Sequence, residues 1–198
     1  MSISFGQYLR TTGVRNALLA LPLLAATQST LAATSQLATT EARQQLHAAY
    51  VQGEGDVQGV KLAVQTESAW LTEYLSHYGI NSTVSFEMSA NFWQFGPDNE
   101  TDQNLVVAFS PILTFPLGQV FHKPLLAEFG IGVSLLDDTT FAGKNVSTHY
   151  QFEDRLGLIY QLSREDALSL RYLHYSNAGF KTPNPGLDFI ALGYSKAF

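Results

Sequence analysis

Hydrophobic and polar residues alternate along most of the chain after Ala33. Between Ile80 and Phe92, for example, the even-numbered positions are mostly apolar and the odd-numbered positions are polar. Successive side chains of a β-strand point to opposite faces, so this alternation predicts a strand with one apolar and one polar face. Eight segments show the pattern, near residues 47–54, 56–67, 79–95, 103–115, 126–137, 147–162, 166–176 and 187–198.

An even number of strands of about ten residues, each with one apolar face, is typical of a transmembrane β-barrel. Closure removes the unpaired strand edges, which a bilayer has no water to satisfy. The polar face would then be the interior, where charged and amide side chains can pair; these are Lys61, Glu87, Asn91, Glu128, Glu153, Arg155 and Arg171. We therefore predict an all-β fold, an eight-stranded antiparallel transmembrane β-barrel. The alternative is a soluble barrel or sandwich with the apolar face inward.

Composition supports a chain that faces something less polar than water. Only 14% of the 198 residues are charged, against roughly 25% in soluble domains. The 17 acidic and 11 basic residues give a net charge of −6, which argues against nucleic acid as a partner. The chain has no cysteine, so disulfides and thiol chemistry are excluded. Four of its five histidines lie in different segments without metal-ligand spacing, namely His47, His77, His122 and His149, so we expect no metal site. We also expect no cofactor.

The first 33 residues are predicted to be a cleaved signal peptide. Arg10 and Arg15 precede a short apolar run, and small residues follow it. A membrane anchor is the alternative, but the run is shorter than the roughly 20 apolar residues that a spanning helix needs. We expect Sec-type export, a polar lead-in over 34–46, and a barrel domain over 47–198.

A histidine and a serine occupy the apolar parity at the end of segment 166–176. His174 and Ser176 project from the same face of a strand, about 6.5–7 Å apart. Asp188 has the outward parity at the start of the next segment, and a hairpin would bring it beside His174. Acid, imidazole and hydroxyl within reach of one another suit acyl transfer.

Two further groups near Ser176 are candidate donors to an oxyanion. They are Asn177 and the backbone N–H near Gly179. The alternative interpretation is that His174 and Ser176 lie just above a bilayer, where polar side chains cost nothing and need no catalytic role.

Several motifs together resemble the PagL family of outer-membrane lipid A 3-O-deacylases. The densest are HYSNAG at 174–179 and PNPG at 183–186, followed by a final strand that ends in Phe198. Upstream, FEDRLG at 152–157 and EFGIGV at 128–133 also match. The resemblance covers essentially the whole chain after the predicted signal peptide.

The resemblance implies an eight-stranded barrel with a serine esterase site on its lipid-facing exterior, which removes the ester-linked 3-hydroxyacyl chain at position 3 of lipid A. It assigns Ser176 as nucleophile, His174 as general base, Asp188 as orienting acid, Asn177 and Gly179 as the oxyanion hole, and Phe152 as an aromatic near the site. The family carries Glu at the orienting position, and Asp188 is shorter by one methylene. Asp154, which shares the parity of Phe152, is therefore a reserve acid.

The implied substrate is lipopolysaccharide, and the implied location is a bacterial outer membrane crossed by several strands, with its lipids as partners. The sequence leaves open whether the barrel forms a homodimer. Two other functions also remain open: a phospholipase-type acyl hydrolase with the same triad, and a non-enzymatic structural barrel.

Overall fold

The computed structural model describes residues 42–96 and 102–198. The chain divides into two units, 1–38 and 39–198, and every described residue belongs to the second. The predicted signal peptide (1–33) and most of the predicted lead-in (34–46) therefore lie outside the described residues.

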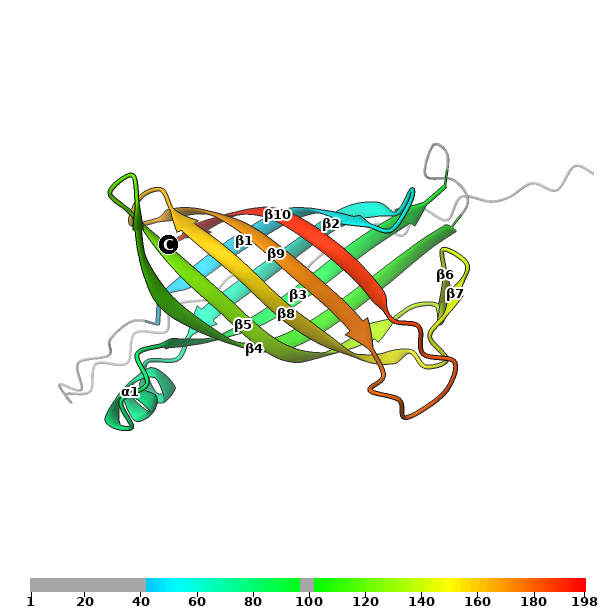
Figure 1. The fold of residues 1–198 in the computed structure, drawn as a ribbon, viewed down its shortest axis with the longest axis horizontal. Helices are drawn as coiled ribbons and strands as arrows, with labels where there is room; N and C mark the ends of the chain where they lie inside the picture. The colour runs from blue at the N-terminus through cyan, green and yellow to red at the C-terminus, as the bar shows by residue number, and fades with distance from the viewer. Residues whose placement is uncertain (1–41, 97–101) are drawn as a thin grey trace, which may run out of the picture. The chain divides into compact units, whose positions relative to one another are not determined.

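Eight strands close into one antiparallel barrel (Figure 1). Each strand pairs with its neighbours along the chain, and pairing of the first with the last closes the ring. The strands are β1 (Gln44–Gly53), β2 (Gln58–Glu67), β3 (Thr83–Phe95), β4 (Asp102–Val120), β5 (Lys123–Leu136), β8 (Tyr150–Gln161), β9 (Asp166–Ser176) and β10 (Leu187–Ala197). The predicted eight-stranded all-β fold is confirmed.

The strand boundaries differ from the predicted ones at several points. β1 begins at Gln44, so the end of the predicted lead-in belongs to the barrel. β3 begins at Thr83, later than predicted, because Gly79 has a φ of 75° and ends a preceding helix rather than opening a strand. β4 extends to Val120, well past the predicted end.

A helix that the sequence analysis did not predict connects β2 to β3. It is α1 (Ala69–His77), which begins after Ser68, whose hydroxyl accepts a hydrogen bond from the backbone N–H of Leu71. None of its residues is buried, so the sequence has no clear core-facing stripe from which to predict it. No helix in the described part of the chain is long and apolar enough to cross a membrane.

The apolar faces of the strands point outward and the polar faces point into the barrel, as predicted. Met88 is 68% exposed, whereas its neighbour Glu87 is 1% exposed. Leu62 and Leu156 are likewise exposed, and the adjacent Lys61 and Arg155 are buried. A soluble barrel with an apolar interior is therefore the wrong alternative for this chain.

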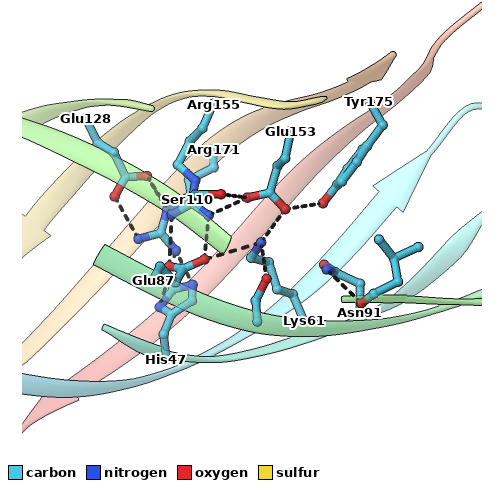
Figure 2. Close-up of polar contacts among 12 residues, drawn as sticks. His47, Lys61, Glu87, Asn91, Ser110, Glu128, Glu153, Arg155, Arg171 and Tyr175 are labelled. Atoms are coloured by element: carbon cyan, nitrogen blue, oxygen red, sulfur yellow. Dashed lines mark hydrogen bonds and ion pairs between the residues drawn. The ribbon is translucent and has the colours of Figure 1, made fainter. Parts of the chain in front are cut away.

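Pairs of opposite charge fill the middle of the barrel (Figure 2). Arg155 makes two hydrogen bonds to the carboxylate of Glu87, at 2.9 and 2.5 Å, and one to Glu153 at 2.8 Å. Lys61 Nζ lies 2.8 Å from Glu153 Oε2 and 3.3 Å from Glu87 Oε1. Each carboxylate is therefore shared between two cations that come from different strands.

A second group continues the network toward β1. Arg171 donates to both carboxylate oxygens of Glu128 and contacts the imidazole of His47. Three cations (Lys61, Arg155, Arg171) thus balance three carboxylates (Glu87, Glu128, Glu153). Buried charges are tolerated only when they are paired and hydrogen-bonded. The ion pairs between strands therefore favour the strand positions that bring these charges together.

Aromatic side chains close the interior at the end where β9 runs into β10. Trp93 stacks on Phe189 with ring centroids 4.3 Å apart and meets the edge of Tyr175 at 4.8 Å. Phe141 packs against the same Trp93 from a hairpin of β6 (Thr140–Phe141) and β7 (Lys144–Asn145). This aromatic cluster packs beneath the loop between β9 and β10, because Tyr175 and Phe189 lie near the two ends of that loop.

Candidate active site on the barrel exterior

His174 and Asp188 lie side by side on the outer surface, on paired positions of β9 and β10. The predicted hairpin between these strands is present, with residues 177–186 as its loop (Figure 1). His174 Nδ1 lies 2.7 Å from Asp188 Oδ1, and the side chains are 30% and 32% exposed. With Nδ1 held by the carboxylate, Nε2 is the nitrogen left to accept a proton.

Ser176 lies on the same face of β9, opposite Phe152 of β8. Its hydroxyl makes no hydrogen bond within the described part of the chain, so it is not paired with His174 in this arrangement. Alternate residues of a strand are about 6.5–7 Å apart, so the side chains of His174 and Ser176 must rotate toward each other to form a hydrogen bond. Catalytic hydrogen bonds are often long without substrate and shorten only in the complex.

A tyrosine that the sequence analysis did not select also contacts the acid. Tyr172 donates its hydroxyl to Asp188 Oδ1 at 2.5 Å. Its parity on β9 is that of His174 and Ser176, so the sequence contained the signal. The alternation predicts only that Tyr172 faces outward among apolar residues, and it does not indicate a hydrogen-bond partner for the phenol.

Gly186 is the second residue near the site that the sequence analysis left without a role. Its φ is 72°, and a Cβ built on it would lie 2.6 Å from Cε1 of His174. The imidazole therefore packs directly on the backbone of residue 186, which no larger residue would permit without moving the ring.

Asp154, the reserve acid, lies on β8 in register with His174, on the side opposite Asp188. Among residues 42–96 and 102–198, the hydrogen bond that His174 makes to a carboxylate is to Asp188. The structure thus pairs the histidine with the first of the two predicted acids.

Asn177 organises the loop that follows Ser176. Its side-chain nitrogen donates to the carbonyls of Val146 and Lys181, at 3.0 and 2.9 Å, and its oxygen accepts from the N–H of Gly179 at 3.0 Å. Its own backbone N–H donates to the side chain of Asn184 at 3.2 Å. Both predicted oxyanion donors therefore already have hydrogen-bond partners, and Asn177 is completely buried.

Apolar rings border the serine. The ring of Phe152 lies 5.2 Å from that of Tyr150 and 6.2 Å from that of Phe180, which is itself 77% exposed. These side chains form an apolar surface beside Ser176, of the kind that an acyl chain can contact. Within the described ranges, no group of three or more histidine and acidic side chains could hold a metal ion.

The chain is similar to known lipid A deacylases over most of its length. The model of the family "Lipid A 3-O-deacylase (PagL)" matches residues 58–197. The lipid A deacylase PagL of Bordetella bronchiseptica is 32% identical over 167 residues, which cover 84% of this chain and 89% of that protein. The PagL of Pseudomonas aeruginosa is 30% identical over 112 residues, 57% of this chain and 63% of that protein.

A solved structure agrees with the fold. The crystal structure of the outer membrane enzyme PagL superimposes with a TM-score of 0.61 at 22% identity, and covers 77% of this chain and 98% of that one. Sequence similarity, barrel architecture and a histidine–carboxylate pair on the exterior all lead to one assignment. The chain therefore belongs to the lipid A 3-O-deacylase (PagL) family and is an ester hydrolase of lipid A.

Proposed function

We propose that this deacylase cleaves the ester at position 3 of lipid A with Ser176 as nucleophile, His174 as general base and Asp188 as orienting acid. The observation that carries the proposal is the 2.7 Å contact between His174 Nδ1 and Asp188 Oδ1, on the face of β9 that also carries Ser176. The contact holds the imidazole in the tautomer whose Nε2 can accept the serine proton.

The reaction proceeds in two halves. Ser176 Oγ attacks the ester carbonyl while its proton passes to His174 Nε2, and the resulting imidazolium is stabilised by Asp188. Collapse of the tetrahedral intermediate breaks the bond to the sugar oxygen, which leaves with the proton from His174. Water then gives a proton to His174 and attacks the acyl-serine, which releases a 3-hydroxy fatty acid and restores the hydroxyl of Ser176.

The negative charge of the tetrahedral intermediate needs donors, and we assign them to the loop after Ser176. The Gly179 N–H now donates to Asn177 Oδ1. In the complex with substrate, the oxyanion would accept the hydrogen bond from the Gly179 N–H in place of Asn177 Oδ1. The side-chain amide of Asn177 would turn away from the carbonyls of Val146 and Lys181 and act as a second donor. One such donor contributes about 3 kcal/mol to catalysis in known hydrolases.

A shorter acid than the family's glutamate is compatible with this mechanism. Asp188 reaches His174 because the two residues are direct register partners on adjacent strands. Asp154 occupies the mirror position on β8 and carries no assigned step.

The exterior position of the site suits a lipid substrate. The strands present apolar side chains outward around the barrel, among them Leu170 of β9 and Ile190 of β10. We propose that the barrel spans the outer membrane, after export and removal of residues 1–33, and that lipid A reaches Ser176 by lateral diffusion along the wall. All assigned groups come from one chain, so the chemistry requires no second barrel.

Mass spectrometry of lipid A incubated with refolded protein tests the proposal. Wild type should release one 3-hydroxyacyl group, Ser176→Ala none, and Ser76→Ala, on α1, as much as wild type. Retained migration of the folded barrel on unheated gels shows that Ser176→Ala still folds. Activity in Ser176→Ala would contradict the mechanism, and preferential cleavage of glycerophospholipid would identify a phospholipase instead.

A further inference from the structure

One oxygen atom of Asp188 accepts two hydrogen bonds. Oδ1 lies 2.7 Å from His174 Nδ1 and 2.5 Å from the hydroxyl of Tyr172. Both donors lie on the same face of β9, and Asp188 belongs to β10 and is in register with His174. The two strands run side by side in the barrel (Figure 1). Tyr172 is in register with Ile190, so its phenol reaches diagonally across the strand pair to the carboxylate.

The acid needs such a partner because little else restrains it. Asp188 is about one-third exposed, and it lies in the second position of β10, next to the loop. Holding such a side chain in one orientation costs rotamer entropy. Without Tyr172, the hydrogen bond to His174 alone would have to offset that cost. A phenol donor to a carboxylate makes a stronger hydrogen bond than a neutral pair.

We propose that Tyr172 is a positioning residue of the deacylase, which holds the Asp188 carboxylate in the orientation that His174 requires. This inference rests on the mechanism proposed above. Tyr172 lies two positions before His174 and four before Ser176 on one face, so a single strand carries the nucleophile, the base and the group that fixes the acid.

The same hairpin contains a matched pair that is remote from the chemistry. At the other end of β9 and β10, the hydroxyl of Tyr194 donates to Asp166, and both side chains lie on the exterior. The two tyrosines have nearly equal exposure, 44% for Tyr172 and 43% for Tyr194. Tyr194→Phe therefore removes an equivalent hydroxyl from the same two strands without touching the site.

The test compares the two phenylalanine variants in steady-state deacylation of lipid A in mixed micelles. In Tyr172→Phe we expect kcat to fall about tenfold with the apparent KM unchanged, because a hydrogen bond to a charged group is lost while the lipid-facing ring remains. In Tyr194→Phe we expect both constants to stay at the wild-type values. A fall in both variants, a change in KM alone, or no change in Tyr172→Phe would each overturn the proposal.

A second comparison asks whether Tyr172 acts through Asp188. In an Asp188→Ala background, with the residual rate followed over long incubations, Tyr172→Phe should cause no further loss, since the group it positions is gone. A further tenfold fall there would assign Tyr172 some other role. Ser176→Ala, assayed in parallel, separates the two levels: activity in that variant refutes the proposed mechanism, whereas an inactive Ser176→Ala beside a fully active Tyr172→Phe refutes only the role of Tyr172.

Discussion

The backbone of Gly186 lies directly against the imidazole of His174. A methyl group at residue 186 would come within 2.6 Å of Cε1 and 3.4 Å of both ring nitrogens. The loop that joins β9 to β10 therefore packs against the imidazole of His174, while Asp188 makes a hydrogen bond to its Nδ1. Two consecutive features of the chain, a glycine turn and a strand start, set the geometry of the base.

We predict that Gly186→Ala lowers kcat about a hundredfold, because moving a catalytic group by about 1 Å has an effect of that size. The variant also carries backbone strain of about 1–2 kcal/mol, since residue 186 has a positive φ. Gly55→Ala is the control: its φ is 61°, but nothing lies within 4 Å of the added Cβ. Equal kcat in the two variants would show that the contact between residue 186 and His174 does not control the rate.

Replacement of each acid beside the histidine distinguishes their roles. Asp188→Asn should reduce kcat by about 10³–10⁴-fold, because an amide in place of the carboxylate favours the wrong tautomer of His174. Asp154→Asn, on the other flank of His174, should leave kcat close to wild type. Rates measured by fatty acid release decide this, and the reverse ranking would make Asp154 the orienting acid.

Asn177→Ala should weaken the loop and the activity together. The variant loses side-chain hydrogen bonds to Val146, Lys181 and Gly179, and a buried group left unpaired costs about 1–3 kcal/mol. Thermal unfolding followed by circular dichroism measures that loss. Asn145→Ala, which removes one exposed contact to Ser147, should have little effect on either quantity. Wild-type stability in Asn177→Ala would contradict its role as the loop's organiser.

Removing one charge from the interior should destabilise the barrel far more than removing one outside. Arg155→Met leaves Glu87 and Glu153 with a buried, uncompensated charge, which costs about 3–5 kcal/mol. Lys196→Met removes exposed ion pairs with Glu165 and Asp166, which solvent screens, so its effect on the free energy of unfolding should be much smaller. Urea titration in lipid vesicles measures both free energies of unfolding, and equal values would show that the interior is solvated.

The sequence predicted the strands and their faces because alternation with a period of two is itself the structural constraint. Glu87 inside and Met88 outside follow from adjacency alone, and a shift of one residue would reverse both. The nearness of His174 and Asp188 followed for the same reason, since a hairpin places the end of one strand beside the start of the next.

Other features depend on the register and on the reach of side chains, which no local pattern contains. Tyr172 touches Asp188 only because a phenol spans a diagonal of the strand pair. The packing of Gly186 on His174 requires the path of the whole loop. The partners of Asn177 come in part from Val146 in a different loop, so its burial could not be read from its neighbours in the sequence.

Tyr175 lies between His174 and Ser176 on β9, and its side chain points into the barrel. Its hydroxyl donates to Glu153 in the interior at 2.7 Å (Figure 2). Its ring packs on Trp93 and Phe189. Even-numbered residues of β9 thus face outward, and odd-numbered residues face the interior. Substitutions at outward positions of β9 can therefore change the surface around His174 and Ser176, while the alternate positions keep their interior contacts. The wall of this barrel is one residue thick, and β9 carries the site on one side and part of the supporting network on the other.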